Sequence, residues 1–107
     1  MAKFLIKVSY SKAGIAGVRK EGATPRAAYI AHLVETIGGN VESLYYAFGP
    51  DDVVLIVDVP DNKTAMAFAA TVGSSDAISS YETVPLLTTE EVDAALKMSV
   101  GYRPPGA

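Results

Sequence analysis

The chain has 107 residues, half of them hydrophobic and a fifth charged, which is typical of a single globular domain spanning residues 1–107. Its net charge of −3, with Arg19 and Lys20 as the only adjacent cations, argues against nucleic-acid binding, which needs a basic stripe. The lack of cysteine excludes disulfides and cysteine-based metal sites, and the short N-terminal apolar run predicts no signal peptide, no membrane span and a cytoplasmic location.

The N-terminal third of the chain predicts a strand followed by helical segments. Residues 4–10 alternate between an apolar face and a mixed face, which indicates a half-buried strand. The mixed face consists of Leu5, Lys7 and Ser9. Ser11 can cap a short turn of helix. Thr24, followed by Pro25, predicts the start of a longer helix, which Gly38 and Gly39 should end.

The middle of the chain predicts a β-hairpin and a second long helix. Residues 41–48 and 53–59 are rich in β-branched and aromatic side chains, and residues 49–52 contain the glycine and proline of a tight turn. Pro60–Asn62 begins a helix whose many alanines suit close packing on a sheet. Residues 73–75 should end this helix.

The C-terminal third predicts a fourth strand over residues 78–84, after which residues 85–87 should leave the sheet. Residues 88–91, Thr-Thr-Glu-Glu, fit a capping box with either threonine as the cap, and the helix should run to about Lys97. The tail, residues 100–107, is expected to be non-helical, and either to lie along a partner surface or to stay free.

This order of elements is β-α-β-β-α-β with an additional C-terminal helix, which predicts an α+β domain with the ferredoxin-like fold. Two long helices can cover only one face of a four-stranded antiparallel sheet. The third strand, residues 52–59, is apolar on both faces, so its second face also needs cover. We therefore expect the chain to pair with itself, as a homodimer or a larger even assembly.

Several segments resemble the GYD domain family, which is named for a Gly-x-Tyr-Asp turn in this hairpin. The segments are Val8–Tyr10, Tyr45–Gly49 with Asp52–Val54, Pro60–Asn62 and Pro85–Thr88. Asp51 stands at the tyrosine position of the family turn, so only Gly49 and Asp52 match it, and no role of that tyrosine is transferred. The resemblance implies a dimeric α/β barrel, as in cofactor-independent monooxygenases, muconolactone isomerases, haem-binding peroxidases and amino-acid sensor domains, but no particular activity.

The mixed strand faces predict a ligand cavity between two paired sheets. The candidate lining residues with polar groups are Lys7, Ser9, Tyr46, Asp52 and Tyr81. Apolar walls with a few polar groups are typical of small-molecule sites, and a buried lysine or carboxylate can act as an acid or base. The alternatives are a structural ion pair between Lys7 and an acidic residue, with packed tyrosines, and an Asp52 that binds backbone N–H groups of its own turn.

Metal binding is not expected, because His32 is the only histidine, and we predict no cofactor. The sequence favours a small-molecule-binding dimeric α/β barrel, with a cofactor-independent monooxygenase or isomerase among the candidates. The alternative is a non-catalytic module that senses a metabolite or serves assembly. Tyr45 and Tyr46 should point to opposite faces of their strand, so we expect them to pack separately.

Overall fold

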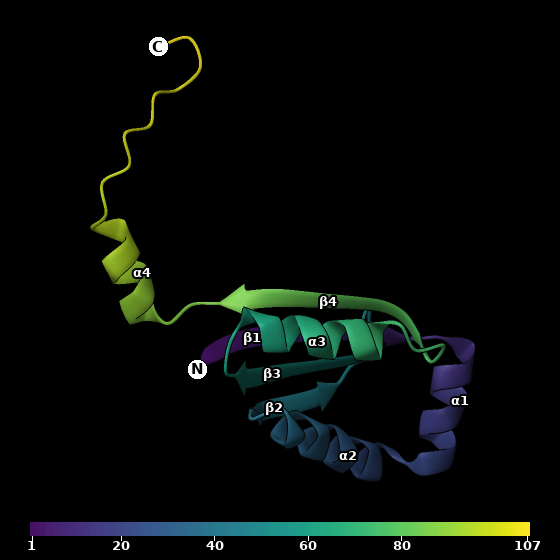
Figure 1. Cartoon of the computed structure of the whole chain (residues 1–107). Coiled ribbons are helices and arrows are strands. Elements are labelled where there is room, and N and C mark those ends of the chain that lie inside the picture. Colours follow the sequence, from purple (N-terminus) through teal and green to yellow (C-terminus); the bar gives the residue numbers. More distant parts are fainter.

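The structure, a computed structural model, describes residues 1–107 and contains the expected order of strands (Figure 1). In chain order the elements are β1 (Ala2–Tyr10), α1 (Lys12–Glu21), α2 (Ala23–Thr36), β2 (Asn40–Tyr46), β3 (Val53–Val59), α3 (Asn62–Gly73), β4 (Ile78–Leu86) and α4 (Thr89–Leu96). The strands form one antiparallel sheet in the order β2-β3-β1-β4. This topology confirms the predicted ferredoxin-like α+β fold.

Helices α2 and α3 lie on one face of the sheet, and the hydrophobic core lies beneath them (Figure 1). Cross-strand pairing of Ile6 with Leu55 and of Phe4 with Val57 places the apolar faces of β1 and β3 on this side. Val34 of α2 is only 1% exposed. Full burial of an apolar side chain stabilises the fold by roughly 1.5–3 kcal/mol, so the alternation of β1 decides which face receives the helices.

The first two helices differ from expectation in extent. Helix α1 has ten residues where a short turn was expected, and Ser11 caps it by accepting a hydrogen bond from the backbone N–H of Gly14 at 3.1 Å. Helix α2 begins at Ala23, with Gly22 rather than Thr24 as its N-cap. Gly22 has a φ of +99°, which lets the chain turn from α1 directly into α2 and places Pro25 inside the first turn.

The edge strands also differ from expectation. Strand β4 continues through Pro85, which pairs with Phe4, and through Leu86, so these residues do not leave the sheet. An edge strand tolerates proline because one side of it needs no ladder hydrogen bonds. Strand β2 ends at Tyr46, and its register shifts at a bulge between Val41 and Ser43.

The second face of the sheet carries no helix. Leu5 pairs with Ile56 on one side and with Val84 on the other, so an apolar strip crosses this face. We call this surface the open face and define it by Leu5, Val54, Ile56 and Val84, all half-buried. The open face leaves apolar surface without cover in a single chain.

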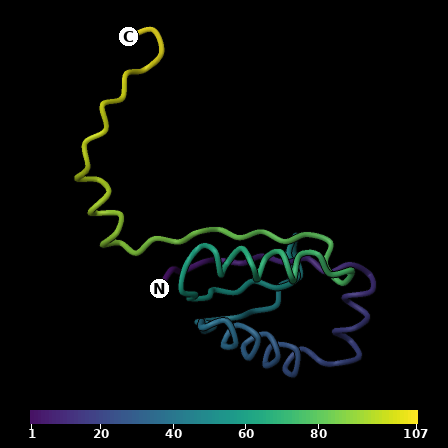
Figure 2. The backbone as a smooth tube through the Cα atoms, viewed as in Figure 1, coloured from purple at the N-terminus to yellow at the C-terminus, as the bar shows by residue number.

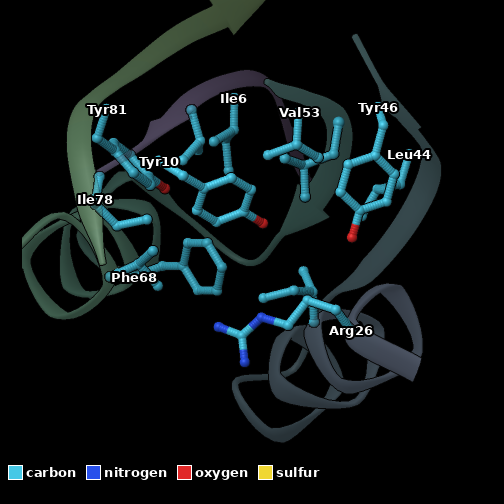
Figure 3. Close-up of a pocket in the computed structure, with 13 residues that line it drawn as sticks. Ile6, Tyr10, Arg26, Leu44, Tyr46, Val53, Phe68, Ile78 and Tyr81 are labelled. Atoms are coloured by element: carbon cyan, nitrogen blue, oxygen red, sulfur yellow. The ribbon is translucent and has the colours of Figure 1, made fainter. Parts of the chain in front are cut away.

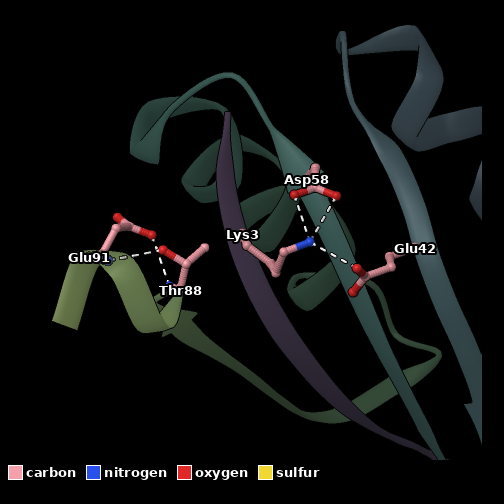
Figure 4. Close-up of polar contacts among 5 residues, drawn as sticks. All are labelled: Lys3, Glu42, Asp58, Thr88 and Glu91. Atoms are coloured by element: carbon pink, nitrogen blue, oxygen red, sulfur yellow. Dashed lines mark hydrogen bonds and ion pairs between the residues drawn. The ribbon is translucent and has the colours of Figure 1, made fainter. Parts of the chain in front are cut away.

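Helix α4 and the tail project away from the sheet (Figure 2). Residues 87–107 are all exposed, and we call this segment the arm. Thr88 and Glu91 form the predicted capping box, since each backbone N–H donates to the side chain of the other, at 2.9 and 3.1 Å (Figure 4). Residues 100–107 are non-helical, as expected. No helix combines the length and apolar composition that crossing a membrane requires.

Candidate functional site

A pocket opens between α2, α3 and the helix-covered face of the sheet (Figure 3). Thirteen residues line it, and Arg26 is the only charged residue among them. Its empty space is about 430 Å³ including the opening to solvent, but the centre of a water-sized sphere can occupy only about 30 Å³ of it. The pocket is therefore narrow: its free space holds about two water molecules, and a ring-sized ligand can enter only if the lining side chains move apart.

Tyr81 provides the most unusual polar group of this pocket. Its ring lies against Phe68 of α3, with the ring centres 6.5 Å apart and the planes tilted by 53°. The Tyr81 hydroxyl is buried and, like the buried hydroxyl of Thr83 on the same strand, makes no hydrogen bond of normal geometry. Burial raises the pKa of Tyr81 to about 12, although the nearby Thr83 hydroxyl opposes this rise, so at neutral pH the phenol is protonated and can donate a hydrogen bond. A buried hydroxyl without a protein partner is uncommon in folded proteins.

Arg26 lies at the mouth of the pocket, in the first turn of α2 (Figure 3). Its guanidinium carbon lies 4.9 Å from the centre of the Tyr29 ring, which is within range of a cation–π contact. The nearest carboxylate oxygen is that of Glu21, at 3.7 Å, which is longer than a hydrogen bond. Arg26 is therefore loosely held and keeps donors available for a ligand.

Tyr46 and Tyr10 complete the polar groups of the pocket, and their hydroxyls point toward the space between the helices (Figure 3). The Tyr46 hydroxyl donates to the backbone carbonyl of Ala23, at 3.2 Å, and so connects β2 to the start of α2. Burial raises the pKa of Tyr46, an effect that the nearby charge of Arg26 opposes. A phenol hydroxyl can both donate and accept a hydrogen bond, and that of Tyr46 already donates to Ala23.

The structure corrects the expected faces of Tyr46 and Tyr81. Tyr46 pairs with Val53, and Tyr81 pairs with Val8, so both tyrosines lie on the helix-covered face and line this pocket. Lys7 lies on the opposite side of the sheet, so the five candidate residues do not share one cavity within the chain. The two faces of β2 and of β4 have similar polarity, and the β2 bulge changes the alternation, so the sequence pattern could not assign these faces.

Lys7 lies on the same side of the sheet as the open face, between two carboxylates. Its ammonium is 3.9 Å from an oxygen of Asp51 and 3.8 Å from an oxygen of Glu82. The lysine side chain is 33% exposed. Asp51, which stands where the family turn has tyrosine, thus contributes to a charge cluster. Within a single chain this arrangement matches the structural ion pair that we considered as the alternative.

Ser9 and Asp52 connect the hairpin turn to the end of β1. The Ser9 hydroxyl donates to the carbonyl of Pro50 at 2.9 Å. The Asp52 carboxylate accepts a hydrogen bond from the backbone N–H of Tyr10 at 2.7 Å. One alternative drawn from the sequence has Asp52 bind backbone N–H groups of its own turn; the carboxylate does bind a backbone N–H, but that of Tyr10 on β1. In a single chain, Ser9 and Asp52 therefore hold the hairpin turn against β1.

A second charge cluster, which the sequence did not reveal, lies at the other end of the same side of the sheet. The Lys3 ammonium is 3.0 Å from Asp58 and 3.1 Å from Glu42 (Figure 4). Hydrogen bonds raise the pKa of Lys3, and the bond to Asp58 contributes more than the bond to Glu42. Lys3 and Asp58 come together because they are paired across β1 and β3. This cluster can be predicted only when the register of the two strands is known.

Two pocket residues were also missed, although the sequence carries a signal for each. Tyr10 has the same parity in β1 as Ile6 and Val8, so it belongs to the helix-covered face. Arg26 stands four residues before Ile30, at the start of the apolar stripe of α2. His32 is exposed, and no group of three or more His, Asp or Glu side chains is arranged to hold a metal ion.

Comparisons with known proteins agree with this architecture. The chain is similar to a solved structure described as "crystal structure of FFRP-DM1", with 16% sequence identity and a TM-score of 0.55, over 81% of this chain and 100% of that chain. At this identity the likeness concerns the fold alone. No curated protein matches the chain. The model of the GYD domain family matches residues 4–96, from β1 through α4, and the chain therefore belongs to the GYD domain family.

Proposed function

We propose that this protein is a small-molecule-binding domain and that its ligand site is the pocket between α2, α3 and the sheet. The observation that carries the proposal is the buried hydroxyl of Tyr81 in a pocket whose walls are mostly apolar. Leaving such a group unpaired costs about 1–3 kcal/mol, which a ligand with a suitable acceptor recovers on binding. Apolar walls with few convergent polar groups are the usual composition of a ligand site.

The chemistry of the pocket favours binding over acid–base catalysis. No carboxylate and no histidine line it. Tyr81, with a pKa of about 12, stays protonated at neutral pH. The pocket thus offers donors but no group that changes protonation near neutral pH, which general acid–base catalysis requires. We therefore favour a non-catalytic, metabolite-sensing role over a cofactor-independent monooxygenase or isomerase.

Self-assembly is the second part of the proposal, and the open face and the arm support it. The open face presents uncovered apolar side chains, and the arm exposes Leu96, Met98 and Val100. A second copy placed sheet to sheet would cover both surfaces and form a dimeric α/β barrel or a larger even assembly. Lys7 and Ser9 would then face the space between the two sheets, which is where the sequence predicts its ligand cavity.

A fragment screen with a pocket-filling variant tests the ligand site. Small aromatic and aliphatic fragments are screened against the full chain by ligand-observed NMR. Ile30→Phe enlarges a side chain that lines the pocket, whereas Met66→Phe makes a comparable change on the exposed surface of α3. We expect hits that Ile30→Phe abolishes and Met66→Phe retains. A screen without hits, or hits that Ile30→Phe leaves unchanged, would contradict the proposal.

A further inference from the structure

We propose that the pocket selects a small apolar monocarboxylate, with its carboxylate at Arg26 and its apolar part between Phe68 and the sheet. This inference rests on the proposed function, because it specifies the ligand class of the same site. Arg26 supplies the charge that an anion needs, and the remaining lining residues supply walls without charge.

Arg26 can exchange its present partner for a ligand. The Glu21 carboxylate lies 3.7 Å from the guanidinium and is 40% exposed, so the pair is solvated and weak. A ligand carboxylate can instead accept two parallel hydrogen bonds from the guanidinium fork, which is the stronger geometry. The contact with the Tyr29 ring holds the guanidinium plane without occupying its N–H donors.

The start of α2 adds to the attraction for an anion. Gly22, as the N-cap, has no side chain to accept hydrogen bonds from the first turn, and the first turn contains no acidic residue. The partial positive charge of the helix N-terminus therefore has no counter-charge within the first turn. Arg26 lies in this same turn, so the partial charge of the helix N-terminus adds to the positive charge of its side chain.

The rest of the pocket argues against a zwitterion or an amine. An ammonium group needs a carboxylate or several carbonyl acceptors, and the only carboxylate near Arg26, that of Glu21, lies outside the pocket lining and is 40% exposed. Arg26 would also repel an ammonium. Phe68 and Tyr81, by contrast, provide aromatic surfaces for a ring or a branched chain. The pocket therefore discriminates an apolar carboxylate from an amino acid by charge, although both carry a carboxylate.

Three ligands of one shape test this selection on the full chain: benzoate, benzamide and benzamidine, which are anionic, neutral and cationic at pH 7. Affinities are measured by isothermal titration calorimetry, and shifts of the Tyr81 ring signals in NMR spectra locate the site. We expect benzoate to bind about tenfold or more tighter than benzamide, and benzamidine to bind weakest. Equal affinities for benzoate and benzamide overturn the carboxylate inference but leave the ligand site intact.

Variants of two arginines separate the pocket charge from the overall charge. Arg26→Gln should weaken benzoate binding about tenfold or more and leave benzamide unchanged, whereas Arg19→Gln, an equal change on the exposed surface of α1, should change neither. Arg26→Lys should bind benzoate with intermediate affinity. Unchanged benzoate binding by Arg26→Gln, or no benzoate binding by the wild type at millimolar concentration, overturns the inference. If the wild type does not bind benzoate, the fragment screen described above still tests whether the pocket binds any other ligand.

Discussion

The carboxylate of Asp52 accepts a 2.7 Å hydrogen bond from the backbone N–H of Tyr10, across 42 positions of the chain. The backbone N–H of Asp52 in turn donates to the carbonyl of Val8 at 2.9 Å. These two contacts fix the hairpin turn to the end of β1, next to the point where Tyr10 enters the pocket. Asp52 is therefore a structural residue that positions one pocket wall.

Replacing Asp52 by alanine should destabilise the protein by about 1–3 kcal/mol, because it leaves the half-buried N–H of Tyr10 without an acceptor. Asp52→Asn keeps an acceptor oxygen and should cost less. Urea unfolding monitored by circular dichroism gives both values. If Asp52→Ala has wild-type stability but no longer binds a fragment that the wild type binds, Asp52 is a ligand-binding residue and the structural role is wrong.

Ile56 lies at the centre of the open face, so Ile56→Asp should disrupt self-assembly. A buried carboxylate without a partner is costly, and we expect the dissociation constant of the dimer to rise more than about tenfold. Light scattering coupled to size-exclusion chromatography measures the mass. Met66→Asp introduces the same charge at an exposed position of α3 and serves as the control. A wild-type chain that is monomeric at micromolar concentration refutes the assembly proposal.

A chain truncated after Leu86, the last residue of β4, should keep its sheet and lose part of its capacity to assemble. Residues 87–107 contribute nothing to the core, so the free energy of unfolding of the monomeric form should stay within about 1 kcal/mol of the full-length value. The dimer should dissociate at higher concentration than that of the full chain. Identical association of both chains would mean that the arm does not contact a partner.

Tyr81 should make stability sensitive to alkaline pH. Its pKa is raised to about 12 in the folded state, so between about pH 10 and 12 the folded chain holds a proton that the unfolded chain releases. Stability contributed by this group is present below pH 10 and is lost as the pH rises to about 12. Because Tyr81 is partly exposed, we expect no more than about 2 kcal/mol.

Tyr81→Phe isolates this effect from the titration of other groups. The variant should lose less stability than the wild type between pH 9 and pH 11, and at pH 7 it should be as stable or slightly more stable, since an unpaired hydroxyl is removed. Tyr45→Phe, at an exposed position, should behave as the wild type. Parallel pH profiles for all three proteins would show that the Tyr81 hydroxyl is not buried in solution.

Glu21→Gln should strengthen benzoate binding, which is the opposite of the effect expected for Arg26→Gln. Glu21 is the carboxylate nearest to Arg26, so its removal frees the guanidinium and makes the pocket mouth more positive. The gain should be about two- to fivefold, because the exposed pair is weak. Calorimetric titration measures it, with Glu35→Gln on the exposed surface of α2 as the control. Weaker binding by Glu21→Gln would contradict the role of Arg26.

The sequence predicts the fold well where one face of an element is clearly apolar. The alternation in β1 and the turn signals around the β2–β3 hairpin suffice for the topology. The pocket was harder to predict, because Tyr46 and Tyr81 lie on strands with two faces of similar polarity. The position of Arg26 depends on where α2 begins, and the positive φ of Gly22 determines that start. The charge clusters on the open side depend on strand register, which the sequence leaves undetermined.

The capping box of α4 has a consequence for the way the arm meets a partner. No residue of α4 is buried, and isolated helices of eight residues are marginal in water. The reciprocal hydrogen bonds of Thr88 and Glu91 favour the helical conformation before any contact is made, so less conformational entropy is lost on docking. The same hydrogen bond from the Thr88 backbone lowers the pKa of Glu91, so acidification through that pKa removes this preorganisation and should slow association.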